Sequence, residues 1–144
     1  MTDTREAHVA AAPASTPYQL IGGEAAVRRL AEAFYDAMEQ EPRFARLRAI
    51  HAADLAPMRA RLADWLTGWM GGPRVYAARH PGRGCIVSAH GRFTIDSQMA
   101  DDWMACMRRA FVGAELSGPL REMLDPALTQ LARALRNDTA GEAP

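Results

Sequence analysis

Apolar residues recur at a spacing of three and four positions along most of the chain, which is the periodicity of an amphipathic helix. In the segment 24–40, the apolar positions are Val27, Leu30, Phe34, Tyr35 and Met38. In the segment 54–70, they are Leu55, Met58, Leu62, Trp65, Leu66 and Trp69. β-branched residues, which strands favour, are scarce apart from a short patch at positions 86–87. The pattern predicts an all-α protein.

The pattern predicts four long helices, over 24–40, 54–70, 96–112 and 120–136, and shorter helical segments over 43–48 and 74–79. Asp54, Asp96 or Ser97, and Ser117 stand where a side-chain oxygen can cap a helix N-terminus. Gly71-Gly72-Pro73 ends the second long helix. Pro126 lies within the last one. Because proline removes a backbone donor, we expect a kink or a break there.

The length of 144 residues favours a single domain with one core. Residues 1–16 are small and polar without periodicity, and we expect them to form a flexible extension. The helical domain then spans 17–136, and 137–144 form a flexible tail. The N-terminal residues lack the basic and apolar regions of a signal peptide, and the chain has no apolar run long enough for a membrane span. These features predict a cytoplasmic protein.

Charge and cysteine content exclude several functions. The 17 basic and 17 acidic residues give a formal net charge of zero, so the chain lacks the broad positive field that favours nucleic acids and membrane surfaces as partners. Every basic residue is arginine, which excludes a Schiff-base lysine and a Walker-type phosphate lysine. Cys85 and Cys106 are too isolated to suggest a zinc site or a disulfide framework.

On residue type alone, the remaining candidates favour structural roles. A single histidine such as His51, His80 or His90 is more often a core or surface residue than a metal ligand. The tryptophans Trp65, Trp69 and Trp103 occupy apolar helical positions and are expected to fill the core. The same holds for Cys106 and for six methionines: Met38, Met70, Met99, Met104, Met107 and Met123.

Five motifs together change this interpretation. They are FY at 34–35, LRAIHAADL at 47–55, GWMGGPRVY at 68–76, HGRFTI at 90–95 and DWMACM at 102–107. In this order and spacing, the chain from about 17 to 136 resembles a group II truncated haemoglobin. The combination is far more specific than any one of its parts. The resemblance implies a two-over-two helical sandwich around haem b, an iron protoporphyrin.

The resemblance also assigns roles to individual residues. His90 matches the proximal histidine, the only protein ligand of the iron, and His80 is its one competitor nearby. Tyr35, Trp103 and His51 match positions on the face where the gas binds. The resemblance places the following residues around the haem: Phe34, Met58, Leu62, Tyr76 and Phe93. Candidate partners of the haem propionates are Arg74, Arg79, Arg83 and Arg92, of which at least two are expected to be surface residues.

Tyr35 and Trp103 offer hydrogen bonds to O2, whose outer atom becomes partly anionic on binding. Two such bonds would slow O2 release, so the resemblance favours redox chemistry or detoxification of nitric oxide or peroxide, with an external reductase, over transport. Carbon monoxide is a further expected ligand. A haem-based gas sensor, or a protein that stores or carries oxygen without turnover, is the alternative. A haem-free helical interaction module is a third.

Overall fold

The computed structural model describes residues 15–82 and 94–137, and all regular secondary structure in these residues is helical. The four long helices are α3 (Glu24–Gln40), α5 (Ala56–Trp69), α8 (Ser97–Gly113) and α9 (Gly118–Ala134). Shorter helices are α2 (Pro17–Ile21), η1 (Pro42–Phe44), α4 (Ala45–Ala49) and α6 (Tyr76–Arg79). The prediction of an all-α chain is confirmed.

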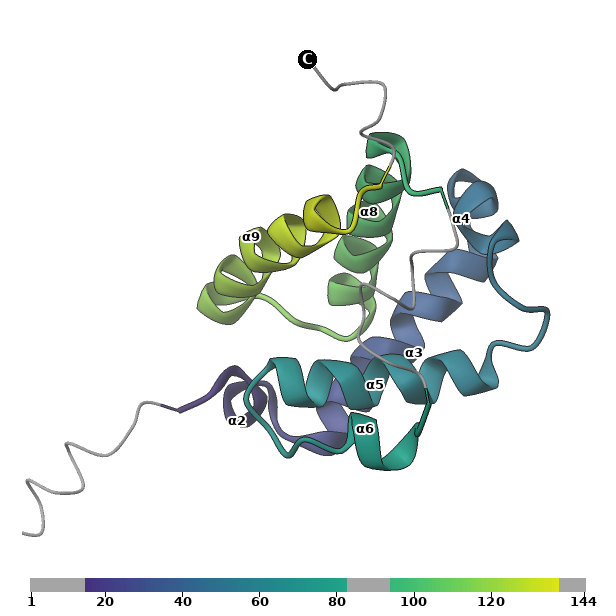
Figure 1. The fold of residues 1–144 in the computed structure, drawn as a ribbon. Helices are drawn as coiled ribbons and strands as arrows, with labels where there is room; N and C mark the ends of the chain where they lie inside the picture. The colour runs from purple at the N-terminus through teal and green to yellow at the C-terminus, as the bar shows by residue number, and fades with distance from the viewer. Residues whose placement is uncertain (1–14, 83–93, 138–144) are drawn as a thin grey trace, which may run out of the picture.

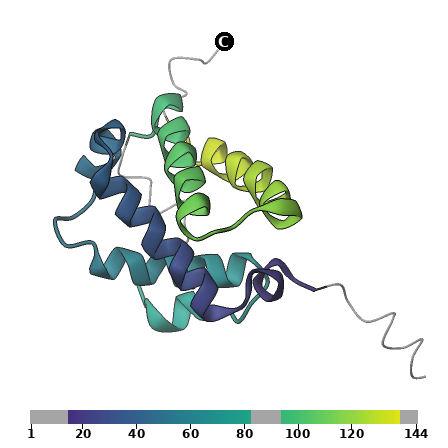
Figure 2. The ribbon, with the colours of Figure 1, turned by 180° about the vertical axis from the view of Figure 1, so that it is seen from behind.

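Helix α3 lies at the centre of the molecule. It packs against α8 on one side and α5 on the other, and α8 packs against α9. Figures 1 and 2 show α8 and α9 in one half of the fold, α5 and α6 in the other, and α3 crossing between them. Leu30, Phe34, Met107 and Phe111 are almost fully buried where these helices meet. The packed pairs are therefore α3 with α5 and α8 with α9, and the contact of α3 with α8 joins them.

The helix ends show which capping predictions hold. Helix α3 has the predicted bounds. Asp96 caps α8 as expected, because its Oδ1 accepts a hydrogen bond of 2.8 Å from the Met99 backbone N–H. Helix α5 begins two residues later than predicted, but Asp54 still accepts a bond of 3.0 Å from the Ala56 N–H. Ser117 holds the N-cap position of α9 without a side-chain hydrogen bond.

Helix α9 continues through Pro126, so the break that was considered there is absent. Leu124 and Leu128 are buried on either side of the proline and hold both halves of the helix on the core. Pro126 is exposed, and so is Glu122, whose carbonyl loses its helical donor. Because that carbonyl lies on the solvent side, water can satisfy it and the helix need not end.

Helix α2 was not predicted from the periodicity. Thr16 accepts a hydrogen bond from the Gln19 N–H, and the Gln19 side chain accepts one from the Thr16 N–H. This capping box was visible in the sequence as Thr-x-x-Gln followed by proline at the first helical position. The Tyr18 N–H donates to the Met70 carbonyl at 3.0 Å, which fixes α2 to the end of α5.

Gly72 is required where α2 meets α5. A Cβ atom there would lie 2.7 Å from the Tyr18 ring and 2.9 Å from the Thr67 carbonyl. We therefore expect Gly72→Ala to lower the free energy of unfolding by about 1–3 kcal/mol. Gly68→Ala is the matched control, because a Cβ there makes only ordinary contacts and should stabilise α5 by up to about 1 kcal/mol. Urea denaturation measures both, and equal stabilities would contradict the contact.

Most of the predicted core residues are buried. Five of the six methionines are at most 4% exposed, and Cys106 is fully buried. Met123 is 45% exposed, so its predicted core role is wrong. Burial raises the pKa of the Cys106 thiol to about 12, which keeps it an unreactive apolar group. In residues 15–82 and 94–137, no helix has the length and apolar character needed to cross a bilayer.

Candidate functional site

One face of α5 is apolar but only partly covered by the described residues. It carries Met58, Leu62, Trp65 and Trp69, all of intermediate exposure, at spacings of four, three and four residues. The Trp65 and Trp69 rings stack with centroids 5.9 Å apart. The expectation that these two tryptophans fill the core is therefore only partly confirmed.

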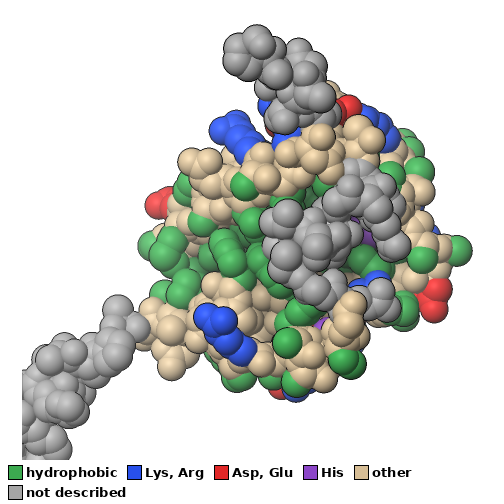
Figure 3. All heavy atoms as spheres, viewed as in Figure 1, with side chains coloured by type: hydrophobic (Ala, Val, Ile, Leu, Met, Phe, Trp, Pro, Cys, Tyr) green, Lys and Arg blue, Asp and Glu red, His purple; other side chains and the backbone are tan. Residues whose placement is uncertain are grey.

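The adjacent face of α5 includes Ala63 and Leu66, both at most 4% exposed, and α5 packs against α3. Figure 3 shows hydrophobic side chains gathered between the region of α5 and that of α9. The folded helices thus leave an apolar strip that they do not bury among themselves.

A row of aromatic rings links α8 to the loop after α4. Trp103 on α8 contacts Phe34 with ring centroids 5.4 Å apart, and Phe34 contacts Tyr35 edge-on at 5.0 Å. The His51 ring lies edge-on to Tyr35 at 5.8 Å. The structure therefore brings together three residues that the sequence placed on the gas-binding face, Tyr35, Trp103 and His51, and encloses Phe34 between two of them.

The Tyr35 side chain carries a hydrogen-bond donor on a buried ring. The residue is 4% exposed, and burial raises the pKa of its phenol well above the usual range, so it stays protonated. The nearby guanidiniums of Arg61 and Arg59 oppose that shift. Among the residues that the structure describes, none accepts a hydrogen bond from the Tyr35 hydroxyl or from the Trp103 indole N–H. Both donors are therefore available to a ligand.

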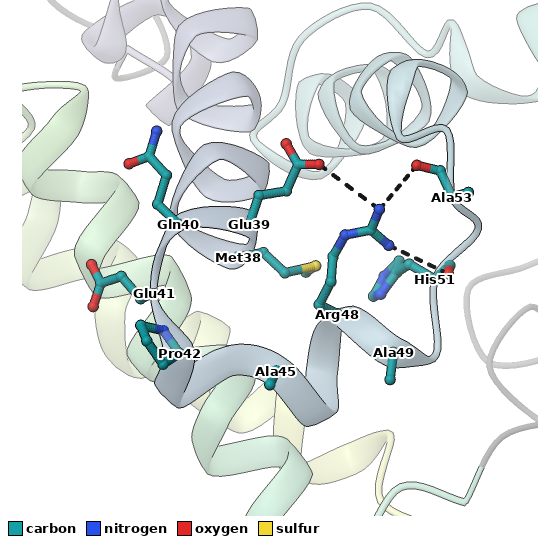
Figure 4. A pocket seen from close by; sticks show the side chains of 10 residues that line it. All are labelled: Met38, Glu39, Gln40, Glu41, Pro42, Ala45, Arg48, Ala49, His51 and Ala53. Carbon is teal, nitrogen blue, oxygen red and sulfur yellow. Dashed lines mark hydrogen bonds and ion pairs between the residues drawn. The ribbon is translucent and has the colours of Figure 1, made fainter.

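His51 is oriented by backbone contacts. Its Nδ1 lies 2.9 Å from the Leu47 carbonyl oxygen. Because a carbonyl only accepts, Nδ1 carries the proton, and in the neutral ring Nε2 is an acceptor. Arg48 donates to the carbonyls of Ala52 and Ala53 at 3.0 and 2.9 Å and holds this loop. Figure 4 shows His51 and Arg48 beside a groove of about 590 Å³.

Arg59 fixes α5 over Tyr35. Its guanidinium donates to Glu32 at 2.7 Å and to Asp36 at 2.9 Å, and lies 3.3 Å from Glu39. These three carboxylates lie on successive turns of α3. The Arg59 Cζ is 6.0 Å from the centre of the Tyr35 ring. This network joins the helix that carries Met58 and Leu62 to the helix that carries the phenol.

Arg74, Arg79 and Tyr76, which were also predicted near the haem, have three different environments in the structure. Arg79 pairs with Asp64 at 2.9 Å and lies 3.8 Å from Glu24. Tyr76 is half-buried and packs on the His80 ring at 5.2 Å. Arg74 is exposed. Outside the described residues lie the remaining predicted site residues and the second cysteine: Arg83, Cys85, His90, Arg92 and Phe93.

His80 already has a partner on α5. Its Nε2 lies 2.8 Å from Oδ2 of Asp64, a carboxylate that is largely buried. Arg79 approaches the other oxygen of the same carboxylate. His80 therefore attaches α6 to α5 through Nε2. His90, the predicted iron ligand, lies outside the described residues.

Arg61 is a candidate that the sequence reasoning missed. It lies on α5 between Met58 and Leu62, contacts the Met58 sulfur, and is the cation that most strongly opposes the raised pKa of Tyr35. Its position one residue before Leu62, on the helix expected to cover the ligand, was the available signal. A positive charge here can act on Tyr35 or on a haem propionate.

The described residues fit a haem. A planar apolar cofactor needs uncovered apolar side chains, and the strip of Met58, Leu62, Trp65 and Trp69 supplies them on α5. A polar gas on its iron needs donors, and Tyr35 and Trp103 supply two. Within 15–82 and 94–137, there is no cluster of three or more histidine, cysteine or acidic residues that could hold a metal ion. Haem needs only one such ligand from the protein.

The comparisons agree with this geometry. The family model of the bacterial-like globins matches residues 16–137. The chain is 32% identical over 128 residues to the group 2 truncated hemoglobin YjbI of Bacillus subtilis, covering 89% of this chain and 93% of that protein.

Three solved structures also resemble it. The group II 2-on-2 hemoglobin of Agrobacterium tumefaciens is 37% identical with a TM-score of 0.79, and the match covers 88% of this chain and 98% of that one. The cold-adapted truncated hemoglobin of Pseudoalteromonas haloplanktis TAC125 is 36% identical with a TM-score of 0.80, and the shares are 86% and 99%.

The third structure is the truncated oxygen-avid haemoglobin of Bacillus subtilis. It is 31% identical with a TM-score of 0.76, and the match covers 85% of this chain and all of that one. The fold, the family model and these relatives agree with one another. The chain belongs to the bacterial-like globin family and is a group II truncated haemoglobin, a haem protein that binds small diatomic ligands such as O2.

Proposed function

We propose that this globin holds haem b through His90 and retains O2 long enough for it to react with nitric oxide or peroxide. The chain has no Cys-x-x-Cys-His motif, which covalent attachment of a c-type haem uses, so a non-covalent haem b fits. When bound, the haem supplies the iron at which O2, nitric oxide or carbon monoxide binds. The other features of the proposal concern the protein's own residues.

The observation that carries the proposal is the Tyr35 hydroxyl, which has no hydrogen-bond partner among the described residues although its ring is buried. A hydrogen bond to a partly charged acceptor contributes about 1.5–3 kcal/mol. A ligand that accepts from Tyr35 and from the Trp103 N–H gains two such bonds. O2 held by two donors leaves slowly, which suits reaction in place better than delivery. One relative is described as oxygen-avid, which agrees with this reasoning.

His51, Arg59 and Arg61 support the donor. His51 packs edge-on against the Tyr35 ring, and the contact of its Nδ1 with the Leu47 carbonyl orients the imidazole beside the phenol. Arg59 holds α5 in place and, with Arg61, adds positive charge near the phenol. The strip on α5 excludes water from the apolar side. Arg79 is engaged by Asp64, so the proposed partners of the haem propionates are Arg74, Arg83 and Arg92 of the predicted set, together with Arg61.

The reaction of the O2 complex with nitric oxide tests this proposal. Protein reconstituted with haem should show a Soret band, and its O2 complex should convert added nitric oxide to nitrate within mixing time, with the iron oxidised in proportion. Nitrate assay and stopped-flow absorbance measure this. Myoglobin without bound O2 is the control for background. A stable O2 complex that leaves nitric oxide unchanged would instead support the sensor or storage alternative.

A further inference from the structure

A groove of about 580 Å³ lies between α8 and α9 and is lined by five arginines, Arg43, Arg108, Arg109, Arg121 and Arg133, and by one acidic residue, Asp101. We call it the arginine groove. The haem site does not require so many arginines together. The chain as a whole has no net charge, so this local excess is a specific feature of this face.

Two of the five guanidiniums are neutralised by nearby carboxylates. Arg108 binds both oxygens of Asp125, at 2.8 and 3.0 Å, and Arg109 pairs with Glu41. With Asp101, three carboxylates therefore face five guanidiniums. A net charge of two positive units remains in the arginine groove.

The other three arginines have no carboxylate partner within the described part of the chain. Arg43 and Arg121 lie over the faces of Phe44 and Phe111, at 5.7 and 5.4 Å, which fixes their positions and leaves their N–H groups free to donate. Arg133 is exposed in the last turn of α9. The two oriented guanidiniums and the exposed Arg133 form a surface suited to carboxylates, which guanidiniums can bind bidentately.

The floor of the groove is apolar. Met104 and Ala132 are buried there, and Val112 is 55% exposed. An apolar centre with arginine around it is the composition of a protein-binding surface. A small anion alone would not need the exposed Val112. The occupant that fits both features is the acidic surface of another protein.

We propose that the arginine groove docks an acidic one-electron carrier protein of the flavodoxin type, which supplies the electron that the haem iron needs after each turnover. This inference rests on the proposed function, since storage alone would need no electron. One electron leaves the carrier's reduced flavin and reduces ferric iron to ferrous iron; no bond forms or breaks. Met104 on the groove floor is adjacent in sequence to Trp103, so one helix, about 10 Å across, separates the two faces.

The positive charge of the arginine groove suits a brief encounter with an acidic electron carrier. Complexes between electron carriers are small and short-lived, and bury less than about 1,200 Å². Their rates depend on electrostatic steering, which raises association by about 10- to 1,000-fold at low salt. A net charge of two positive units around an apolar floor provides steering without tight binding.

The test uses the haem-loaded protein and reduced flavodoxin as the probe. Stopped-flow absorbance follows reduction of ferric haem under carbon monoxide, and calorimetry follows binding to oxidised flavodoxin. In the wild type, the rate of reduction and the affinity for flavodoxin should both fall steeply as salt rises, because the Debye length shrinks from about 10 Å at 0.1 M to about 3 Å at 1 M. Arg43→Glu with Arg133→Glu turns the net charge of the groove from two positive to two negative units, so it should slow reduction at low salt at least tenfold and make the rate rise, not fall, with salt.

Two controls isolate the arginine groove. Arg28→Glu with Arg29→Glu changes the net charge equally on an exposed face of α3 and should leave the flavodoxin rate within about twofold of wild type. Arg43→Lys with Arg133→Lys keeps the charge and should retain most of the rate. Reduction by dithionite should be the same in all variants.

Flavodoxin rates that are equal in the groove and control variants would overturn the docking proposal, as would failure of flavodoxin to reduce the wild type. Loss of the Soret band, or failure of the O2 complex to react with nitric oxide, would instead indicate that the proposed function is wrong. The two failures are therefore distinguishable.

Discussion

Replacement of His90 by glycine is expected to abolish haem retention, with loss of the Soret band after gel filtration. A globin binds its iron through one protein ligand, so removal of that imidazole leaves only apolar contacts and propionate pairing to hold the cofactor. Free imidazole added to His90→Gly should restore the band, because it can occupy the space that the side chain vacates. Haem titration followed at the Soret maximum measures both effects.

His80→Ala is the matched control, because His80 is the only competing histidine near this position. Its Nε2 is held 2.8 Å from Asp64, so its loss should leave haem binding intact. It should instead lower the free energy of unfolding by about 1–3 kcal/mol, since the largely buried Asp64 carboxylate keeps only Arg79. Haem loss in His80→Ala with retention in His90→Gly would reverse the assignment.

Tyr35→Phe should speed O2 dissociation by about 10- to 100-fold. The variant removes one hydroxyl and keeps the ring that packs on Phe34 and His51. A hydrogen bond to a partly charged acceptor contributes about 1.5–3 kcal/mol, and each 1.4 kcal/mol changes a rate about tenfold. Trp103→Phe should have an effect of similar size. Stopped-flow displacement of O2 by carbon monoxide measures the rates.

Tyr18→Phe is the control for this series, since Tyr18 lies on α2 at the end of α5, outside the aromatic row. Its dissociation rate should equal that of the wild type. The double variant of Tyr35 and Trp103 should fall short of the product of the single effects, because both rings pack on Phe34 and neighbouring sites couple. Unchanged rates in both single variants would show that neither donor reaches the ligand.

The periodicity predicted the helices well because helix formation depends on residues three and four positions apart. The bounds of α3 and the cap at Asp96 follow from such local spacing. The resemblance predicted that Tyr35, His51 and Trp103 share the face where the gas binds. The structure places their rings in one row with Phe34. His90 and its surroundings remain a prediction from the motif alone.

At Thr16 and Asn137, the structure differs from the prediction of flexible ends. The prediction assigned Thr16 and Asn137 to the flexible ends. In the structure, Thr16 caps α2, and the Asn137 backbone N–H and side chain both pair with the backbone of Ile95, at 2.8 and 2.6 Å. The first contact was visible as a local motif. The second joins residues 42 positions apart, which no periodicity reveals.

The sequence by itself determined the helices, their order and the family to which the chain belongs, since these depend on local spacing and on short motifs. Only the tertiary structure decided that His80 binds Asp64, that Arg59 joins α5 to three carboxylates of α3, and that one face of α5 stays partly exposed. Each of these is a contact, or a missing contact, between segments distant along the chain. Their formation depends on how whole helices pack, and the identity of a residue and its near neighbours does not contain that information.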